Sequence, residues 1–250
     1  MVTDGGGWTV IQRRLPQKEQ ENFSRAWSSY KEGFGQLEGE MWLGLEAMHQ
    51  LTHSGHYELR VDMVDYELGP KYAKYKEFRV GPQKDGYRLF IANYSGNAGD
   101  ALSYFHSGRR FSTLDRDQDL ARNKSCAQDK EGGWWFHACY SAHPNGRFPT
   151  ILTRLTDGKE IRWWASREHV LVLTHFEMKI RQRRKDHDSV VVTPANKDDH
   201  ESSLAESTED MADDYLVQGD AARESEDKVF DYSGHEGRSD ILPWGLQAIN

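Results

Sequence analysis

Alternating apolar and polar positions predict β-strands in the first 185 residues. Residues 56–66 and 169–182 each carry apolar side chains at every second position, and a period of two places such side chains on one face of a strand. The apolar positions are Tyr57, Leu59, Val61 and Met63 in the first segment, and Val170, Val172, Thr174, Phe176, Met178 and Ile180 in the second. Shorter strands are predicted over 7–14 and 87–96.

Two short segments have the spacing of helices instead. In 24–34 (SRAWSSYKEGF), Trp27 and Tyr30 lie three positions apart, and Ser24 is a candidate N-cap because its hydroxyl can accept a hydrogen bond from the first turn. A second short helix is predicted over 43–52 (LGLEAMHQLT). Turns rich in glycine and proline separate these elements. Mostly antiparallel strands with a few short helices and long loops predict an α+β fold.

The charge distribution divides the chain into two parts. Residues 186–250 hold 17 Asp and Glu against 4 Lys and Arg, a balance of −13, whereas residues 1–185 hold 28 Lys and Arg against 23 Asp and Glu, a balance of +5. The acidic part is poor in large apolar side chains, so burial cannot offset the entropy lost on ordering it. We therefore predict a folded domain over 1–185 and a disordered acidic tail over 186–250, which is either merely solvated or an interaction arm.

The sequence gives no indication of a transmembrane helix or of a signal peptide in its first ten residues. No run of about 18 apolar residues occurs, which argues against a transmembrane helix and against membrane insertion. The first ten residues, MVTDGGGWTV, lack a basic segment followed by an apolar one, so they do not resemble a signal peptide.

Three aspartates alternate at Asp115, Asp117 and Asp119. Carboxylate oxygens at alternating positions suit a hard cation such as Ca²⁺, which a loop can surround with side chains and backbone carbonyls. An EF-hand also requires Gly at the sixth loop position and Glu at the twelfth, and these positions hold Leu120 and Cys126. The EF-hand is excluded, which leaves another kind of calcium loop or a solvated acidic turn.

Cys126 and Cys139 are the only two cysteines of the chain. Their spacing matches neither a redox Cys-x-x-Cys motif nor a zinc knuckle. Two buried thiols, or a disulfide formed in an oxidising compartment, remain as interpretations.

Three histidines, His49, His53 and His56, raise the question of zinc. One helix would bring His49 and His53 together, but a Ser-Gly pair ends that helix before His56, and no His-Glu-x-x-His motif is present. The sequence therefore disfavours zinc here. It also lacks a nucleophile elbow, a P-loop and a dinucleotide-binding motif, so a hydrolase or other enzyme has no support at the level of motifs.

Three Asn-x-Ser sequons begin at Asn22, Asn93 and Asn123. A single sequon carries little weight, because the motif matters only in a chain that enters the secretory route. All three are candidates for N-glycosylation if this chain is secreted.

Seven segments of the first 185 residues occur together in a known order. They are DGGGWTVIQRR, YKEGFGQLEGEMWLGLEAMHQLT, YELRVDM, NYSGNAGDALSY, FSTLDRDQD, CAQDKEGGWWFHACY and NGRF, between Asp4 and Arg181. Together they resemble the fibrinogen C-terminal (fibrinogen-related) domain, in its tenascin-, angiopoietin- and ficolin-like forms. The resemblance implies a central antiparallel sheet with short helices and long loops. The family's small N-terminal subdomain has no counterpart here, so we expect an N-terminally truncated domain over 1–185.

The resemblance also implies a disulfide and a calcium site. In the family, the cysteines of such a segment are bonded to each other, which here means Cys126 with Cys139. The aspartates just before them hold a calcium ion, and two backbone carbonyls complete the protein ligands. The implied ligands are Asp117 and Asp119 by side chain, and Ala121 and Asn123 by backbone carbonyl.

A ligand pocket is implied beside the disulfide. Its expected residues are Lys130, Phe136, Ala138, Tyr140 and Trp164. In fibrinogen-type chains, an acidic residue and a histidine at the places of Lys130 and Tyr140 capture a new peptide N-terminus. A lysine would repel the ligand's ammonium group, so we predict no such capture. Acetyl-binding members often have an aromatic residue at the place of Lys130, so we expect a rebuilt pocket that takes a protein or a polyanionic glycan.

The function that the resemblance implies is extracellular recognition and not catalysis. Members bind protein receptors or matrix components, or act as innate-immune lectins for acetylated glycans, through loops that calcium and a disulfide support. We expect a secreted glycoprotein of the extracellular space or matrix that acts in recognition or cell adhesion, with the lectin as the alternative. Its partner is expected to be an extracellular protein or glycan and not a nucleic acid. Oligomerisation would use the region that precedes this domain in related chains.

Overall fold

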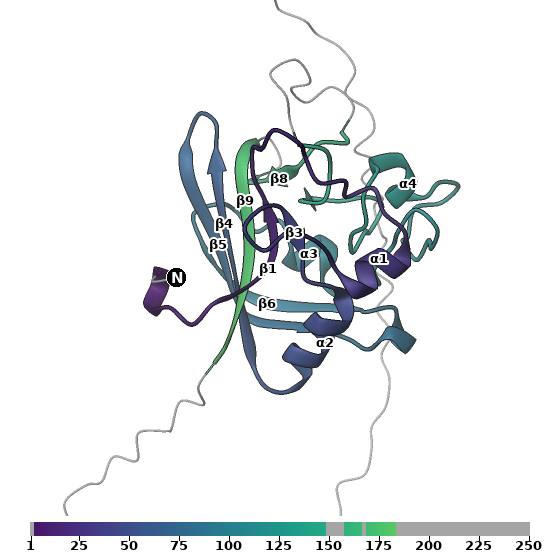
Figure 1. Cartoon of the computed structure of the whole chain (residues 1–250), viewed down its shortest axis with the longest axis horizontal. Helices are drawn as coiled ribbons and strands as arrows, with labels where there is room; N and C mark the ends of the chain where they lie inside the picture. The colour runs from purple at the N-terminus through teal and green to yellow at the C-terminus, as the bar shows by residue number, and fades with distance from the viewer. Residues whose placement is uncertain (1–2, 149–157, 167–168, 184–250) are drawn as a thin grey trace, which may run out of the picture. The chain divides into compact units, whose positions relative to one another are not determined.

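The computed structural model describes residues 3–148, 158–166 and 169–183 (Figure 1). The predicted acidic tail, 186–250, lies outside the described residues. The described part has the predicted α+β architecture, with one antiparallel sheet, short helices and long loops.

The sheet has the strand order β2-β3-β1-β9-β4-β5-β6, with β7 and β8 joined to β9 at one side. The strands are β1 (Thr9–Arg14), β2 (Phe34–Gly35), β3 (Met41–Trp42), β4 (Tyr57–Asp65), β5 (Gly69–Val80), β6 (Leu89–Gly96), β7 (Ala142–His143), β8 (Arg162–Trp164) and β9 (Val170–Gln182). The helices are α1 (Trp27–Glu32), α2 (Leu45–His53), α3 (Ser103–His106) and α4 (Cys126–Lys130), and short 3-10 turns lie at Thr3–Gly5 and Gln83–Asp85.

Strands β4 and β9 form the centre of the sheet. Val61 pairs with Met178, and Met63 pairs with Phe176. All four side chains are buried, as the period of two in both segments predicts. The charged residues between them point to the other face, where Lys179 forms ion pairs with carboxylates on both strands.

The single apolar face predicted for 169–182 is wrong in its first half. Leu171 and Leu173 are buried there, in place of the even-numbered residues. The register of β9 against β4 shifts between Val64 and Asp65, as happens at a β-bulge, where one strand carries an extra residue. The extra residue reverses which positions face the core, so the prediction holds only from Phe176 onward.

Helix α1 begins later than predicted, and its expected cap is wrong. The residue before the helix is Ala26, and no side chain next to it caps the first turn. The carboxylate of Asp115 instead accepts a hydrogen bond of 2.8 Å from the backbone N–H of Trp27. A residue far along the chain therefore caps the helix in place of Ser24. It also ties the aspartate loop, residues 115–125 before α4, to α1.

Strand β5 has no counterpart among the predicted elements. Ala73 and Tyr75 are buried at odd positions, whereas Phe78 and Val80 are buried at even ones. The change of parity, together with Pro70 and several lysines, hides the period of two on which the prediction depends.

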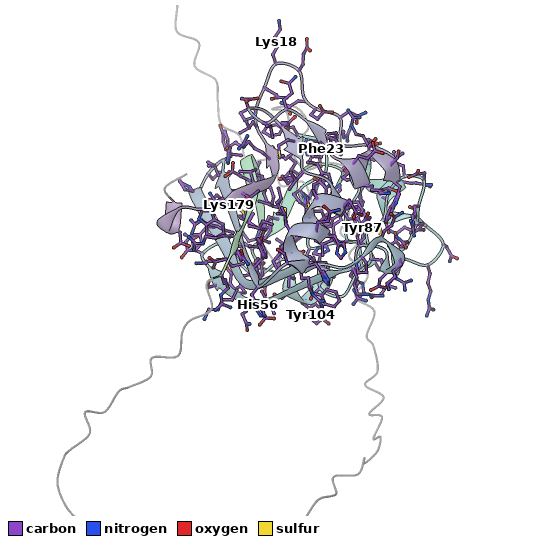
Figure 2. The ribbon with its side chains drawn as sticks, turned by 60° about the horizontal axis from the view of Figure 1, so that its bottom comes forward. Lys18, Phe23, His56, Tyr87, Tyr104 and Lys179 are labelled. Carbon is purple, nitrogen blue, oxygen red and sulfur yellow. A yellow bond between two sulfur atoms is a disulfide. The ribbon has the colours of Figure 1, made fainter. Side chains whose placement is uncertain are left out.

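Aromatic side chains fill the space between the sheet and the helices. The largest fully buried ones are Trp42, Trp134, Trp135, Trp163, Tyr30, Tyr75, Tyr87, Phe111, Phe136 and Phe176. Figure 2 shows Phe23 and Tyr87 within the body of the domain and Lys18 at its periphery. Gly133 is needed for this packing, because a Cβ there would lie 2.6 Å from the Tyr30 ring and 2.8 Å from the Phe111 ring.

Candidate functional site

The candidate site is built from loops that follow β6 and from the short helix α4. Figure 1 shows α4 and β8 toward the upper end of the domain, away from the lower end where α2 lies. A disulfide joins Cys126, the first residue of α4, to Cys139, with Cα atoms 5.5 Å apart. The peptide bond between Ala138 and Cys139 is cis. The structure thus has the disulfide that the family resemblance implies.

Asp119 organises the aspartate loop. One carboxylate oxygen accepts a hydrogen bond of 2.8 Å from the N–H of Ala121, and the other accepts one of 2.7 Å from the N–H of Cys126. The loop therefore closes on itself and positions the start of α4. Each carboxylate oxygen has two lone pairs, so these bonds leave acceptor capacity for a cation.

The electrostatics of the loop favour a cation beside Asp119. Burial, together with the neighbouring charge and hydrogen bond of Asp117, raises the pKa of Asp119 to about 6. Two carboxylates held close together repel each other when both are ionised, and a divalent cation would relieve that repulsion. The donor set, with the carbonyls of Ala121 and Asn123 as the further candidates, consists of oxygens only and suits Ca²⁺.

Side chains alone do not make a complete metal site. Within 3–148, 158–166 and 169–183, no group of three or more His, Cys, Asp or Glu side chains is arranged to hold a metal. A cation beside Asp117 and Asp119 would therefore need backbone carbonyls and water as its other ligands. Asn123 has a left-handed conformation, with φ of 66°, so the loop turns sharply at one of the two candidate carbonyl donors.

The loop is also tied to the segment that carries Cys139. The N–H of Leu120 donates a hydrogen bond of 2.8 Å to the carbonyl of His137, and the N–H of His137 donates one of the same length to the carbonyl of Cys139. Ordering of the aspartate loop is thereby coupled to the backbone on both sides of Ala138.

Lys130 and Tyr140 come together around Gly158. The hydroxyl of Tyr140 donates a hydrogen bond of 2.7 Å to the carbonyl of Gly158, and a Cβ on that glycine would lie 3.3 Å from Nζ of Lys130. Lys130 also forms an ion pair of 3.0 Å with Asp129. A basic group and a phenol therefore lie close together near the disulfide.

The other predicted pocket residues have different positions. Phe136 has no exposed surface, and its ring centroid lies 6.4 Å from that of Tyr140, so it packs in the core near Tyr140. Ala138 is exposed. Trp164 is half-buried in β8, and its N–H donates to the carbonyl of Ser141, the residue after Tyr140.

His106 holds this region together, although nothing in the sequence pattern points to it. Its Nδ1 lies 2.8 Å from the carbonyl of Trp135, and its Nε2 accepts hydrogen bonds from the N–H groups of Ser141 and Ala142. The ring is therefore neutral, with its proton on Nδ1. Burial lowers the pKa of His106 to about 4. A buried histidine that links segments far apart in the sequence has no local signal by which it could be found.

Buried polar side chains of β1 tie the site to the sheet. Nη1 of Arg14 donates to the carbonyls of Pro144 and Gly146, at 3.0 and 2.6 Å. Nε of the same side chain forms a buried ion pair of 2.8 Å with Glu40. Gln12 adds a hydrogen bond of 3.1 Å to the carbonyl of Pro144. The sequence prediction treats β1 as a simple strand and misses these contacts.

The three sequons lie at the surface. Asn22, Asn93 and Asn123 are all exposed. Asn93 lies in β6, where its amide donates to Glu77, whereas Asn123 lies in the aspartate loop itself. Each side chain is accessible to modification in the folded chain. Among the residues that the structure describes, no helix is long and apolar enough to cross a membrane.

Comparison with known proteins identifies relatives for most of the domain. The family model of the C-terminal globular domain of fibrinogen beta and gamma chains matches residues 1–183. Human fibrinogen C domain-containing protein 1 is 46% identical over 192 residues, which are 74% of this chain and 40% of that protein. The chain thus spans less than half the length of that relative. Human microfibril-associated glycoprotein 4 is 45% identical over 188 residues, which cover 73% of this chain and 72% of that protein.

Solved structures agree with this fold. The fibrinogen-like globe domain of human ANGPTL6 has a TM-score of 0.68 and 40% identity, and the match covers 73% of this chain and 81% of that one. Lamprey fibrin D-dimer, solved with the peptide Gly-His-Arg-Pro-amide, has a TM-score of 0.62 and 34% identity, with 78% and 68% of the two chains covered. The chain belongs to the family of fibrinogen C-terminal globular domains.

Proposed function

We propose that this chain is an extracellular recognition module that binds a protein receptor or a matrix component through loops supported by calcium. Membership of a family of binding domains supports this proposal, as does the similarity to microfibril-associated glycoprotein 4, whose name places it with an extracellular structure. The disulfide supports secretion, because such bonds persist in oxidising compartments. The chain acts by binding and not as an enzyme.

The single observation that carries the proposal is the cluster of Lys130, Tyr140 and Gly158 beside the disulfide. Lys130 ends helix α4, whereas Tyr140 and Gly158 lie in loops, and loops are where binding residues commonly occur. A basic head group next to an aromatic hydroxyl suits a ligand that offers carboxylates, sulfates or backbone carbonyls. The ligand class is therefore an acidic protein surface or a polyanionic glycan.

Calcium is proposed as the cofactor of this site. Asp117 and Asp119 would bind it through their carboxylates, and Ala121 and Asn123 through their carbonyls. When bound, the ion would neutralise the two carboxylates and remove the repulsion that, after burial, contributes to the raised pKa of Asp119. The loop would then hold His137, and through it Cys139, in the position that shapes the pocket.

Lys130 also separates this chain from relatives that capture a peptide N-terminus. Lamprey fibrin D-dimer was solved with the peptide Gly-His-Arg-Pro-amide. We propose that this chain does not bind that peptide, because Nζ of Lys130 would face its cationic groups in the pocket. The same lysine replaces the aromatic surface that would pack on an acetyl group, so the lectin is the second candidate function.

A solid-phase assay separates the two candidates. The chain is applied to a decellularised fibroblast matrix and, separately, to acetylated agarose beads, each with millimolar calcium or with a chelator. The proposal predicts retention on the matrix that the chelator or Asp119→Asn abolishes, with little retention on the beads. Strong calcium-dependent capture by the acetylated beads would instead make this chain a lectin, and Lys130→Tyr should then strengthen that capture.

A further inference from the structure

Helix α2 places two histidines one turn apart. His49 and His53 are four positions apart in the sequence, and their ring centroids are 5.5 Å apart with an angle of 34° between the ring planes. His49 is half-buried and His53 is exposed. Side chains at i and i+4 lie on the same face of a helix, so both imidazoles face one side of α2.

A hydrogen bond from the sheet fixes the first of these rings. Nδ1 of His49 lies 2.9 Å from the carbonyl of Val80, the last residue of β5. A carbonyl can only accept, so Nδ1 carries the proton and Nε2 carries the free lone pair. Thr52, between the two histidines, accepts a hydrogen bond from the N–H of Val80, which holds α2 against β5. The arrangement resembles the outer-shell contact by which metal-binding histidines are usually oriented.

We propose that His49 and His53 together bind one divalent transition-metal ion of the zinc and copper class. Neutral imidazole is a preferred ligand of Zn²⁺ and Cu²⁺. His49 supplies Nε2 from a ring that is already oriented, and exposed His53 supplies a nitrogen from a ring that is free to turn. Two protein ligands leave the remaining coordination positions to water or to a group from a partner.

The site differs from a zinc site that would include His56 as a third ligand. His56 follows the end of the helix, and within the described residues no third His, Cys, Asp or Glu joins the pair. The structure therefore supports a two-histidine surface site and not an enclosed zinc site. It is also chemically distinct from the aspartate loop, since oxygen ligands select Ca²⁺ and imidazoles select the softer ions.

The two sites are separated in space as well. Figure 1 shows α2 at the lower end of the domain and α4, with the aspartate loop before it, at the upper right. Figure 2 places His56, which follows α2, at the lower edge of the domain. A metal on α2 would therefore leave the proposed ligand pocket open.

Calorimetric titration of the full chain with zinc chloride tests the proposal, in a phosphate-free buffer with millimolar calcium. We expect one saturable site with micromolar affinity. His49→Gln and His53→Gln should each weaken zinc binding by about tenfold or more, whereas the matched control His56→Gln and the calcium-loop variant Asp119→Asn should not change it. The absence of a saturable site, or equal binding by His53→Gln and the unmodified chain, would overturn the proposal.

Imidazole nitrogen NMR gives an independent test at the level of atoms. Zinc should shift the resonance of Nε2 of His49 and leave its Nδ1 protonated, because Nδ1 donates to Val80. Copper should bind more tightly than zinc at the same residues. Coordination through Nδ1 of His49, or shifts at His56 without shifts at His49 and His53, would contradict the assignment.

Discussion

The sheet of this domain and its site end, which comprises the loops after β6 and helix α4, are stabilised in different ways. In the sheet, β4 and β9 pair along most of their length, and apolar side chains such as Val61 and Met178 repeat along the interface. At the site end, the chain runs through long loops with only short helices, and single contacts fix it. These contacts are the disulfide, Asp119, His106 and the side chains that reach across from β1.

The difference shows where the two regions are vulnerable. Stability that is spread over many equivalent apolar contacts changes by modest amounts when one side chain is trimmed. A loop held by one buried polar group loses its anchor when that group is removed, and the partner is then left buried without a hydrogen bond. Substitutions at the site end should therefore cost more than conservative changes in the sheet.

The largest effect is expected for Arg14→Met. This change leaves the Glu40 carboxylate buried without its partner and frees the carbonyls of Pro144 and Gly146. Removing one member of a buried ion pair costs about 3–5 kcal/mol of unfolding free energy. Urea denaturation monitored by tryptophan fluorescence measures this loss. Arg25→Met, which breaks a more exposed ion pair with Glu21, is the matched control and should cost at most about 1 kcal/mol.

Removal of the disulfide should have the next largest effect. The bond closes a loop with a sequence separation of 13, and the loop-entropy model gives about 3 kcal/mol for a loop of this size. Cys126→Ala combined with Cys139→Ala should lower the unfolding free energy by that amount. The same variant should weaken calcium binding, because Asp119 accepts from the backbone of residue 126. A variant as stable as the parent chain would show that the sheet alone holds the site end in place.

His106 should make the domain sensitive to acid. Its pKa is lowered to about 4 in the folded chain, whereas an unfolded histidine titrates near 6.5. The neutral ring therefore stabilises the fold fully above about pH 6.5, and this contribution is lost as the pH falls toward 4. Between these values we expect a loss of about 2–3 kcal/mol.

Comparison with His106→Gln isolates this effect. Urea unfolding at pH 6.5 and at pH 4 should show that the parent chain loses about 2–3 kcal/mol more than the variant over this interval. His143, whose pKa burial lowers to about 3, is present in both chains and cancels in the comparison. If both chains lost the same unfolding free energy between pH 6.5 and pH 4, His106 would titrate normally and would not stabilise the site through a neutral ring.

The smallest effect is expected from Ile180→Val in the sheet. Ile180 is fully buried in β9, and loss of one methylene there costs about 0.5–1.5 kcal/mol. Calcium affinity measured by calorimetry should not change, because Ile180 pairs with Thr9 and Leu59 inside the sheet and not with the aspartate loop. A loss of calcium affinity in this variant would show that the two regions are not as separate as proposed.

The same contrast explains which features could be predicted from the sequence. The period of two in β4 predicted Leu59, Val61 and Met63 as core residues, because successive side chains of a regular strand point to opposite faces. The bulge in β9 hid the parity of its first half, and the shifted parity of β5 hid that strand altogether. Such irregularities depend on how strands pair and leave no mark in the pattern of one segment.

At the site end, the family motifs predicted more of the structure than the hydrophobic periodicity did. The family resemblance indicated the bonded cysteines and the neighbourhood of Lys130 and Tyr140. It gave no hint of His106 or Arg14, because each of these side chains acts on backbone groups far away in the sequence. A buried polar contact of that kind becomes visible only when the chain is folded.

Hydrogen exchange with and without calcium tests the central claim most directly, which is that a calcium-supported loop shapes the site while the sheet stands independently. Amide exchange of the full chain is followed by mass spectrometry, in millimolar calcium and in chelator, for the parent chain and for Asp119→Asn. We predict that calcium slows exchange in the segments 115–126 and 134–142, leaves β4, β5 and β9 unchanged, and has no effect on the variant. The account would be contradicted if calcium left exchange at the aspartate loop of the parent chain unchanged. It would also be contradicted if calcium slowed exchange in the sheet as much as in the loop.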